Sequence, residues 1–191
     1  YPIHPQIHAS SRSHIFLATK IDGGNLVALK FPSADLREDQ NYLRRFAMEE
    51  WIARRVSSIH VLKSETPAIP RRTLYLVTEF VDGETLEQSM KDRPQPDLRN
   101  VRDIVSQIAD GLRALHRKEI IHQDLRPANI MIDSNGTVKI IDFGSAQVAG
   151  IAEADVAIFD LHILARDRGV MIVHVVDDGR HVALTRQGKY V

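Results

Sequence analysis

Hydrophobic residues in the first third of the chain form two kinds of pattern, short continuous runs and a helical spacing. Apolar runs at 15–18 and 26–31 flank an Asp-Gly-Gly-Asn stretch at 22–25, whose composition is typical of a tight turn. We therefore predict a β-hairpin over 15–31. Between 39 and 57 the apolar residues recur at helical spacing with Arg and Glu between them, which predicts an amphipathic helix.

The next part of the chain alternates short apolar runs with helical patterns. The run at 74–81 predicts a buried strand, and a short helix is expected at 84–91. Apolar residues at helical spacing over 98–117 predict a long amphipathic helix. Two short strands are expected at 130–132 and 138–141, on either side of a Ser-Asn-Gly turn.

This order of elements predicts an α+β fold with two lobes. We expect a β-rich first lobe at 1–81 and the start of a helical second lobe at 82–150. Residues 151–191 form a divergent tail, in which a helix is expected at 153–166 and then a hairpin. The chain begins without Met, so we expect it to be part of a longer polypeptide.

Composition narrows the class of protein further. Hydrophobic residues make up 43% and charged residues 26%, and 25 basic residues balance 25 acidic ones. This balance is typical of globular proteins and argues against a generally basic nucleic-acid surface. The chain has no cysteine and no run near the roughly 18 apolar residues of a membrane span. A cytoplasmic location, without nucleic acid or a membrane segment, is the expectation.

Three oxygen-bearing side chains stand out in an otherwise apolar stretch: Asp124, Asn129 and Asp142. Phosphoryl transfer from ATP requires Mg²⁺, which prefers carboxylate and amide oxygens together with phosphates and water. It also requires a carboxylate that orients or deprotonates the attacking hydroxyl. The spacing of these residues, with Asp142 at a strand end, predicts that they converge on one metal–nucleotide site.

Three segments, in order and at compatible spacing, resemble the motifs of eukaryotic-type serine/threonine protein kinases. They are the Val-Ala-Leu-Lys strand ending at Lys30, the His-Gln-Asp-Leu-Arg-Pro-Ala-Asn segment at 122–129, and Asp-Phe-Gly at 142–144. The resemblance implies a protein-kinase-like two-lobe fold whose second lobe is truncated or divergent. More narrowly, the segments 12–18, 122–127 and 139–145 resemble the kinase half of bacterial bifunctional phosphatase/kinase proteins. This resemblance implies fusion to, or action with, a phosphatase domain.

The resemblance also implies a role for individual residues, with ATP and Mg²⁺ as cofactors and a protein hydroxyl as the acceptor. Asp124 would be the catalytic base and Arg126 would contact the γ-phosphate. Lys30 would hold the α- and β-phosphates, and Glu49 would hold Lys30. The metal ligands would be Asn129 and Asp142. Glu79 and Val81 would offer backbone groups to the adenine, and Thr78 would lie behind it. Ala28 and Met131 would lie on its two faces, and Ile15 would also contact the nucleotide.

The sequence departs from this pattern in the phosphate-binding loop. The glycine-rich loop is replaced by the stretch from Ile7 to His14, which contains no glycine. Glycine lets backbone approach phosphates closely, so either Ser and Arg side chains supply the contacts here or ATP binds weakly. In addition, Gln123 replaces the Arg that pairs with a phosphorylated activation loop in the family, so that mode of activation is not expected.

Two other functions remain open at this point. Small-molecule kinases of the aminoglycoside or choline type share a His-x-Asp-x-x-x-x-Asn loop, but they usually lack Asp-Phe-Gly and the Val-Ala-Leu-Lys strand. A catalytically impaired, ATP-binding pseudokinase fragment would explain the missing glycines and the short second lobe. We expect His122 to be structural, bonding backbone near the metal site rather than acting as a base.

Overall fold

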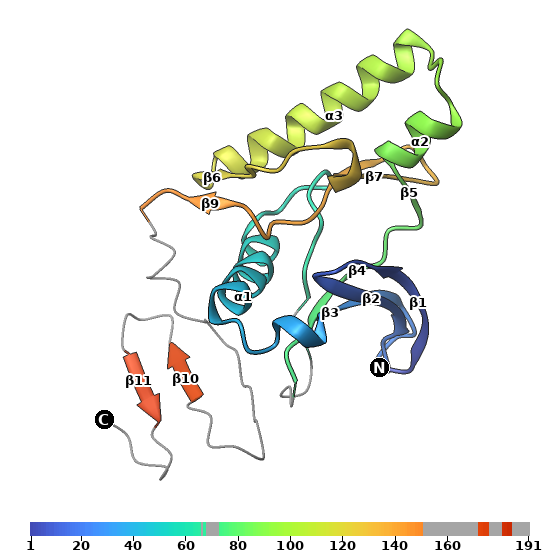
Figure 1. The fold of residues 1–191 in the computed structure, drawn as a ribbon. Helices are drawn as coiled ribbons and strands as arrows, with labels where there is room; N and C mark the ends of the chain where they lie inside the picture. Colours follow the sequence, from blue (N-terminus) through green and yellow to red (C-terminus); the bar gives the residue numbers. More distant parts are fainter. Residues whose placement is uncertain (66, 68–72, 151–171, 176–180, 185–191) are drawn as a thin grey trace.

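The first part of the molecule is a four-stranded antiparallel sheet in the order β1-β2-β3-β4 (Figure 1). The computed structural model describes residues 1–65, 67, 73–150, 172–175 and 181–184. The predicted hairpin and the later strand are confirmed. The strand bounds are Ile3–Ala9, Ser13–Thr19, Leu26–Pro32 and Leu76–Glu79.

Strand β1 was not predicted from the sequence. Every residue of β1 is exposed and its pairing with β2 contains register shifts, so no alternation of buried and exposed positions marks it. The stretch assigned to the phosphate loop therefore spans the end of β1, a turn at 10–12 and the start of β2. The loop itself is only this short turn.

The strand register separates the two faces of the sheet. Lys30 lies opposite Ile15 and Leu76, while its neighbour on the same face, Ala28, lies opposite Leu17 and Thr78. The other face packs into its own apolar cluster, built on Ala18, Val27, Leu29 and Val77. The register alone thus brings the predicted ATP residues of three strands onto one face.

Helix α1 (Gln40–Arg55) confirms the predicted amphipathic helix. Asp39 caps it, because its carboxylate accepts hydrogen bonds from the N–H groups of Asn41 and Tyr42. Two charged residues of this helix, Glu49 and Glu50, are buried rather than exposed. A buried carboxylate needs a partner, and Glu49 finds its partner in the sheet.

The second part of the molecule contains two helices and a small sheet in the order β5-β7-β8. It confirms the predicted helices and hairpin; β5 and the pair formed by β6 and β9 were not predicted. Short 3-10 turns lie at Ala34–Leu36 and Pro127–Asn129. The bounds are Gly83–Thr85 (β5), Leu86–Asp92 (α2), Leu98–His116 (α3), Ile120–Ile121 (β6), Ile130–Asp133 (β7), Val138–Ile140 (β8) and Gln147–Val148 (β9).

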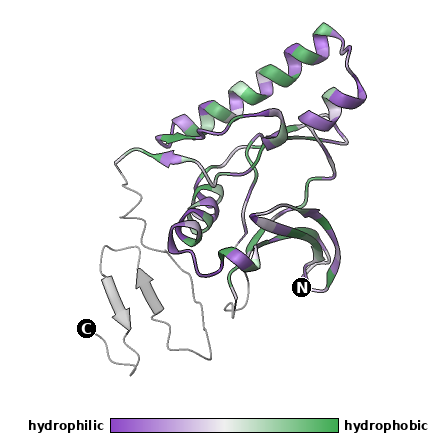
Figure 2. Ribbon diagram, in the orientation of Figure 1, coloured by the Kyte–Doolittle hydropathy of each residue, from purple (hydrophilic) through white to green (hydrophobic). Residues whose placement is uncertain are grey.

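Buried apolar residues connect the two parts. One cluster joins Ile52 and Ala53 of α1, with Val56 directly after the helix, to Leu115 at the end of α3. It also includes Ile140 and Phe143. Figure 2 shows apolar and polar residues interleaved along α3. Burial of the α3 apolar face is greatest at its C-terminal end, so this end anchors α3 to the core.

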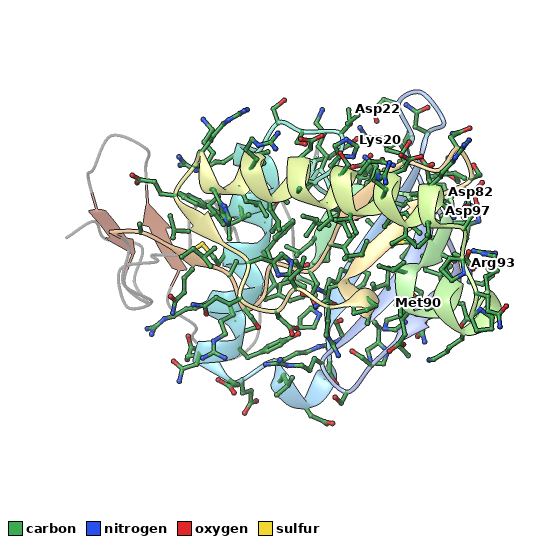
Figure 3. All side chains as sticks on the ribbon, turned by 90° about the horizontal axis from the view of Figure 1, so that it is seen from above. Lys20, Asp22, Asp82, Met90, Arg93 and Asp97 are labelled. Carbon is green, nitrogen blue, oxygen red and sulfur yellow. The ribbon has the colours of Figure 1, made fainter. Side chains whose placement is uncertain are left out.

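The crossing between the two parts follows β4. Figure 3 labels Asp82, Met90 and Arg93 in this region. The Arg93 guanidinium pairs with Glu84 of β5 and donates to the Ser89 hydroxyl at 2.6 Å, which fastens the end of α2 to β5. Gly83 lies so close to β7 that an added Cβ would be 2.0 Å from the Ile132 carbonyl oxygen.

Part of the tail is described by the structure. Strands β10 (Ile172–Val175) and β11 (His181–Leu184) pair antiparallel, as the predicted hairpin requires. The predicted helix at 153–166 lies outside the described residues. The division of the chain at 81/82 and 150/151 stays a prediction. Within the described ranges, we find no helix with the length and apolar character needed to span a bilayer.

Candidate active site

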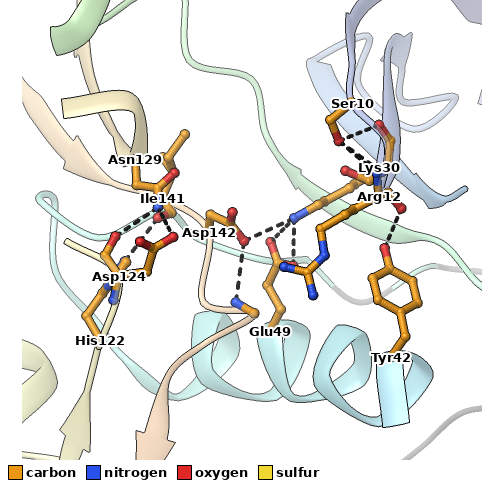
Figure 4. Close-up of polar contacts among 12 residues, drawn as sticks. Ser10, Arg12, Lys30, Tyr42, Glu49, His122, Asp124, Asn129, Ile141 and Asp142 are labelled. Atoms are coloured by element: carbon orange, nitrogen blue, oxygen red, sulfur yellow. Dashed lines mark hydrogen bonds and ion pairs between the residues drawn. The ribbon is translucent and has the colours of Figure 1, made fainter. Parts of the chain in front are cut away.

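The centre of the candidate site is an ion pair between the sheet and α1 (Figure 4). The Lys30 ammonium lies 2.7 Å from both carboxylate oxygens of Glu49. The two side chains are largely buried, with 15% of Lys30 and 7% of Glu49 exposed. The pair fixes the position of α1 against the nucleotide face of the sheet, and it was predicted from the sequence.

Lys30 also reaches the second part of the chain. Its Nζ lies 3.4 Å from Oδ1 of Asp142. Burial disfavours the charged form of Lys30, but the nearby carboxylates of Glu49 and Asp142 outweigh this effect. They raise the pKa of Lys30 above its ordinary value. Burial likewise opposes ionisation of Asp142, but the Lys30 charge and the Gly144 N–H together lower the pKa of Asp142. The ammonium and the carboxylate are therefore both charged at neutral pH.

The segment before Asp142 is bonded to the 122–129 segment through both backbone groups of Ile141. The Ile141 N–H donates to the Asn129 carbonyl at 2.9 Å. The His122 Nε2 lies 3.1 Å from the Ile141 carbonyl oxygen, and its Nδ1 accepts from the Asp124 N–H at 3.3 Å. His122 is only 2% exposed. These contacts confirm the expectation that His122 bonds backbone beside the site.

Asp124 is oriented by two neighbouring side chains. The Asn129 amide donates to Asp124 Oδ2 at 2.9 Å and to the Asp124 backbone oxygen at the same distance. The Arg126 Nε lies 3.4 Å from the same Oδ2. The other carboxylate oxygen, Oδ1, has no hydrogen bond within the described part of the chain. One oxygen is thus held while the other can accept a proton.

Two residues of the site have left-handed backbone conformations. Gln123 has φ = 60° and Asp142 has φ = 63°. Such conformations cost non-glycine residues about 1–3 kcal/mol and gather at functional sites. In each case the residue lies in or beside a motif identified from the sequence, and its conformation is fixed by the bonds around His122 and Ile141.

The residues present fit a magnesium ion that is shared with phosphates. Asn129 and Asp142 offer amide and carboxylate oxygens, the ligand type that Mg²⁺ prefers. Asp142 Oδ2 and Asn129 Oδ1 have no hydrogen-bond partner among the described residues. Within the same residues there is no group of three or more His, Asp or Glu side chains that could hold a metal alone. Mg²⁺ usually binds one or two carboxylates plus substrate phosphates, which is what this donor set allows.

The predicted adenine residues lie on the same face of the sheet and at the crossing that follows it. Ala28 and Thr78 are buried and paired across β3 and β4, and Val81 is buried just beyond. Met131 is partly buried in β7. The Glu79 carboxylate accepts from the Lys63 N–H and the Lys139 ammonium. The Glu79 N–H donates to the Lys63 carbonyl oxygen at 3.0 Å, which leaves the Glu79 carbonyl oxygen for the predicted adenine contact.

Two contributors to the site were not identified from the sequence. Lys139, three residues before Asp142, bonds Glu79 at 3.0 Å and so connects β8 to the end of β4. Tyr42 shares the α1 face of Glu49, seven residues earlier, and its hydroxyl reaches the turn between β1 and β2. The helical spacing of Tyr42 and Glu49 is a signal that could have identified it, whereas the Lys139–Glu79 pairing left none.

Comparison with known proteins agrees with this geometry. Residues 3–160 match the protein kinase domain family. The chain is 33% identical over 142 residues to the serine/threonine-protein kinase PknA of Corynebacterium glutamicum, covering 72% of this chain and 30% of that protein. It is 32% identical over 143 residues to the probable serine/threonine-protein kinase PknB of Bifidobacterium longum, covering 70% and 20%.

A third relative is similar over a shorter stretch. The probable serine/threonine-protein kinase MRK1 homolog of Encephalitozoon cuniculi is 41% identical over 105 residues, covering 55% of this chain and 31% of that protein. The chain thus spans less than a third of the length of these curated relatives. The family match covers most of the chain and includes every predicted site residue. The chain belongs to the protein kinase domain family, with the α+β fold that its sequence predicts.

Proposed function

We propose that this chain carries the ATP-binding and catalytic groups of a serine/threonine protein kinase that transfers the γ-phosphate of ATP to a protein hydroxyl. The observation that carries the proposal is the contact of Lys30 with both Glu49 and Asp142. It brings a phosphate-binding cation and a metal-binding carboxylate together from distant parts of the sequence. The names of the similar proteins support the same activity.

Each residue of the site has a distinct role in the proposed reaction. Lys30 binds the α- and β-phosphates, and Glu49 keeps its ammonium in place. Asn129 and Asp142 would hold Mg²⁺, and the bound ion would neutralise phosphate charge. Asp124 Oδ1 accepts the proton of the substrate hydroxyl, while the Asn129 amide holds Oδ2. Arg126, whose side chain is 59% exposed, can turn toward the γ-phosphate.

The adenine sits against the sheet face that carries Ile15 and Ala28, with Thr78 behind it and Met131 on the opposite side. The Glu79 carbonyl oxygen and the backbone groups of Val81 bond its edge. The register of β2, β3 and β4 supports this arrangement, because it puts the first three side chains on one face. The mostly apolar character of this surface suits a flat aromatic base.

Transfer of radiolabelled γ-phosphate tests the proposal. The purified chain is incubated with Mg²⁺ and labelled ATP, together with basic proteins in one arm and aminoglycosides or choline in the other. We expect label on serine and threonine of protein, and a loss of about 10²–10⁴-fold in rate for Asp124→Asn. Label on small alcohols alone would favour a small-molecule kinase. ATP binding without any transfer would favour the pseudokinase alternative.

Two further predictions concern an associated phosphatase domain and the location of the protein in the cell. The sequence phrases shared with bifunctional bacterial proteins lead us to propose an adjacent or interacting phosphatase domain. The cysteine-free composition leads us to propose the cytoplasm. Reading the adjoining coding sequence checks the first, and cell fractionation checks the second.

A further inference from the structure

The turn between β1 and β2 is held by a serine side chain in place of glycine backbone. The Ser10 hydroxyl oxygen accepts hydrogen bonds from the N–H groups of Arg12 at 3.2 Å and Ser13 at 3.1 Å. The same hydroxyl donates to the Ser13 carbonyl at 3.2 Å, and the Ser10 N–H donates to that oxygen at 2.9 Å. Serine often closes turns in this way. The turn is therefore ordered by its own side chain.

A second contact ties this turn to α1. The Tyr42 hydroxyl donates to the Arg12 carbonyl oxygen at 2.6 Å, and the Ser33 N–H donates to the same oxygen at 2.8 Å. A carbonyl oxygen has two lone pairs, so both are used. Burial raises the pKa of the Tyr42 phenol, which keeps it protonated as a donor at neutral pH.

The contact between the turn and α1 is linked along the helix to Lys30 and Glu49 at the centre of the site. Tyr42, Phe46 and Glu49 follow the i, i+4, i+7 spacing that puts them on one face of the helix. The rings of Tyr42 and Phe46 are 6.0 Å apart, and the Lys30 ammonium lies 5.9 Å from the centre of the Phe46 ring. The turn, Lys30 and Glu49 thus contact one rigid helical surface.

The Arg12 side chain is available to a ligand. It is exposed, and among the described residues its guanidinium pairs with no carboxylate. The centre of the Tyr42 ring lies 5.9 Å from the guanidinium carbon. Figure 4 shows the side chain directed toward Lys30 and Glu49. A guanidinium binds phosphate with paired, charge-assisted hydrogen bonds.

We propose that this turn is a phosphate-binding loop without glycine, in which Arg12 binds the ATP phosphates and Tyr42 is the positioning residue that holds the loop over Lys30. The inference rests on the proposed ATP-dependent function and adds two residues to it. The Arg12 guanidinium makes the phosphate contacts that glycine backbone usually makes. Tyr42 holds the turn at a distance from Lys30 at which both cations bind the same polyphosphate.

Calorimetric titrations with Mg²⁺–ATP and with adenosine test the inference, because adenosine fills the base site but has no phosphate. We expect Arg12→Gln to weaken Mg²⁺–ATP binding about tenfold or more, the effect of losing a charged hydrogen bond. Tyr42→Phe, which removes one oxygen, should weaken it several-fold. Neither variant should change adenosine affinity, and Arg12→Lys should restore part of the loss. Arg37→Gln and Tyr75→Phe are matched controls outside the turn and should bind both ligands like wild type.

Each other outcome has a distinct meaning. Unchanged ATP affinity in Arg12→Gln and Tyr42→Phe overturns the inference, even when the wild-type chain binds ATP. An equal loss of ATP and adenosine affinity in Tyr42→Phe also overturns it, because general damage to the sheet would then explain the change. A wild-type chain that binds neither ligand overturns the proposed function itself.

Discussion

The Lys30 ammonium lies 3.4 Å from the Asp142 carboxylate, although 112 residues separate them along the chain. The contact joins the end of β3 to the segment that follows β8. Lys30 is held on its other side by Glu49 of α1. Three elements that are distant in the sequence therefore meet at one cation, and the position of each depends on the other two.

Removing one partner of the buried pair should destabilise the protein. Breaking a buried ion pair costs roughly 3–5 kcal/mol when a charge is left without compensation. Asp142 remains near Lys30 in Glu49→Gln, so we expect a loss near the lower end of that range. In Lys30→Met the Glu49 carboxylate stays buried without a cation, which should cost at least as much. Urea denaturation of each variant measures the loss.

The double variant Lys30→Met/Glu49→Gln is the control for this prediction. It leaves no unpaired charge between the sheet and α1, so it should be more stable than Lys30→Met alone. A double variant whose loss equals the sum of the two single losses would show that the two side chains do not interact.

Phe143 should contribute to stability through packing alone. It is 1% exposed and lies in the cluster that joins α1 to β8 and α3. Phe143→Ala should cost about 3–5 kcal/mol because it leaves a cavity. Phe143→Leu should cost about 1.5 kcal/mol or less, since most of the volume is kept. Equal losses for the two variants in thermal denaturation would argue against a packing role.

The sequence predicted the parts of this fold that depend on local patterns. The hairpin over 15–31 and the helix α1 follow from turn chemistry and helical spacing, which act within a few residues. The site residues Lys30, Asp124 and Asp142 were found from motif order. The structure brings Lys30 to 3.4 Å from Asp142 and bonds Asp124 to Asn129. The catalytic roles of these residues stay predictions.

Features that depend on distant contacts left no local signal. Strand β1 carries no alternation because it is exposed throughout. The burial of Glu50, and the bond from Lys139 to Glu79 across 60 residues, are set by packing between elements. Helical spacing marks Tyr42 as a neighbour of Glu49, but it does not reveal the hydrogen bond from the Tyr42 hydroxyl to Arg12, because the acceptor is a backbone oxygen that any residue type offers.

Gly83 should not tolerate a side chain. A Cβ there would lie 2.0 Å from the Ile132 carbonyl oxygen and 2.7 Å from the Asp133 Cα, both of which are backbone atoms. Gly83→Ala should therefore force β5 away from β7 and cost roughly 3 kcal/mol or more. Gly24→Ala is the control, since no atom lies within 4 Å and only its φ of +71° is strained. That strain should cost about 1–2 kcal/mol. A smaller loss at Gly83 than at Gly24 would contradict the pairing of β5 with β7.

Asp133 should make stability depend on acid pH. Slight burial opposes its ionisation, but the N–H groups of Thr137 and Asn135 outweigh this and lower the pKa of Asp133 below its ordinary value of 3.8. The native carboxyl then binds fewer protons than the unfolded one, so its stabilising effect is present above pH 3.8 and is lost as pH falls toward the lowered pKa. The difference in melting temperature between wild type and Asp133→Ala should shrink between pH 6 and pH 3. A difference that stays constant over this range would contradict the assignment.

The Mg²⁺ dependence of ATP binding tests the central claim most directly, namely that Lys30, Asn129 and Asp142 form one metal–nucleotide site. Calorimetric titration of the wild-type chain should show ATP affinity rising about tenfold or more when Mg²⁺ is added. Asp142→Asn should lose this enhancement and keep its affinity for adenosine. An Asp142→Asn variant that retains the full Mg²⁺ enhancement would contradict the account.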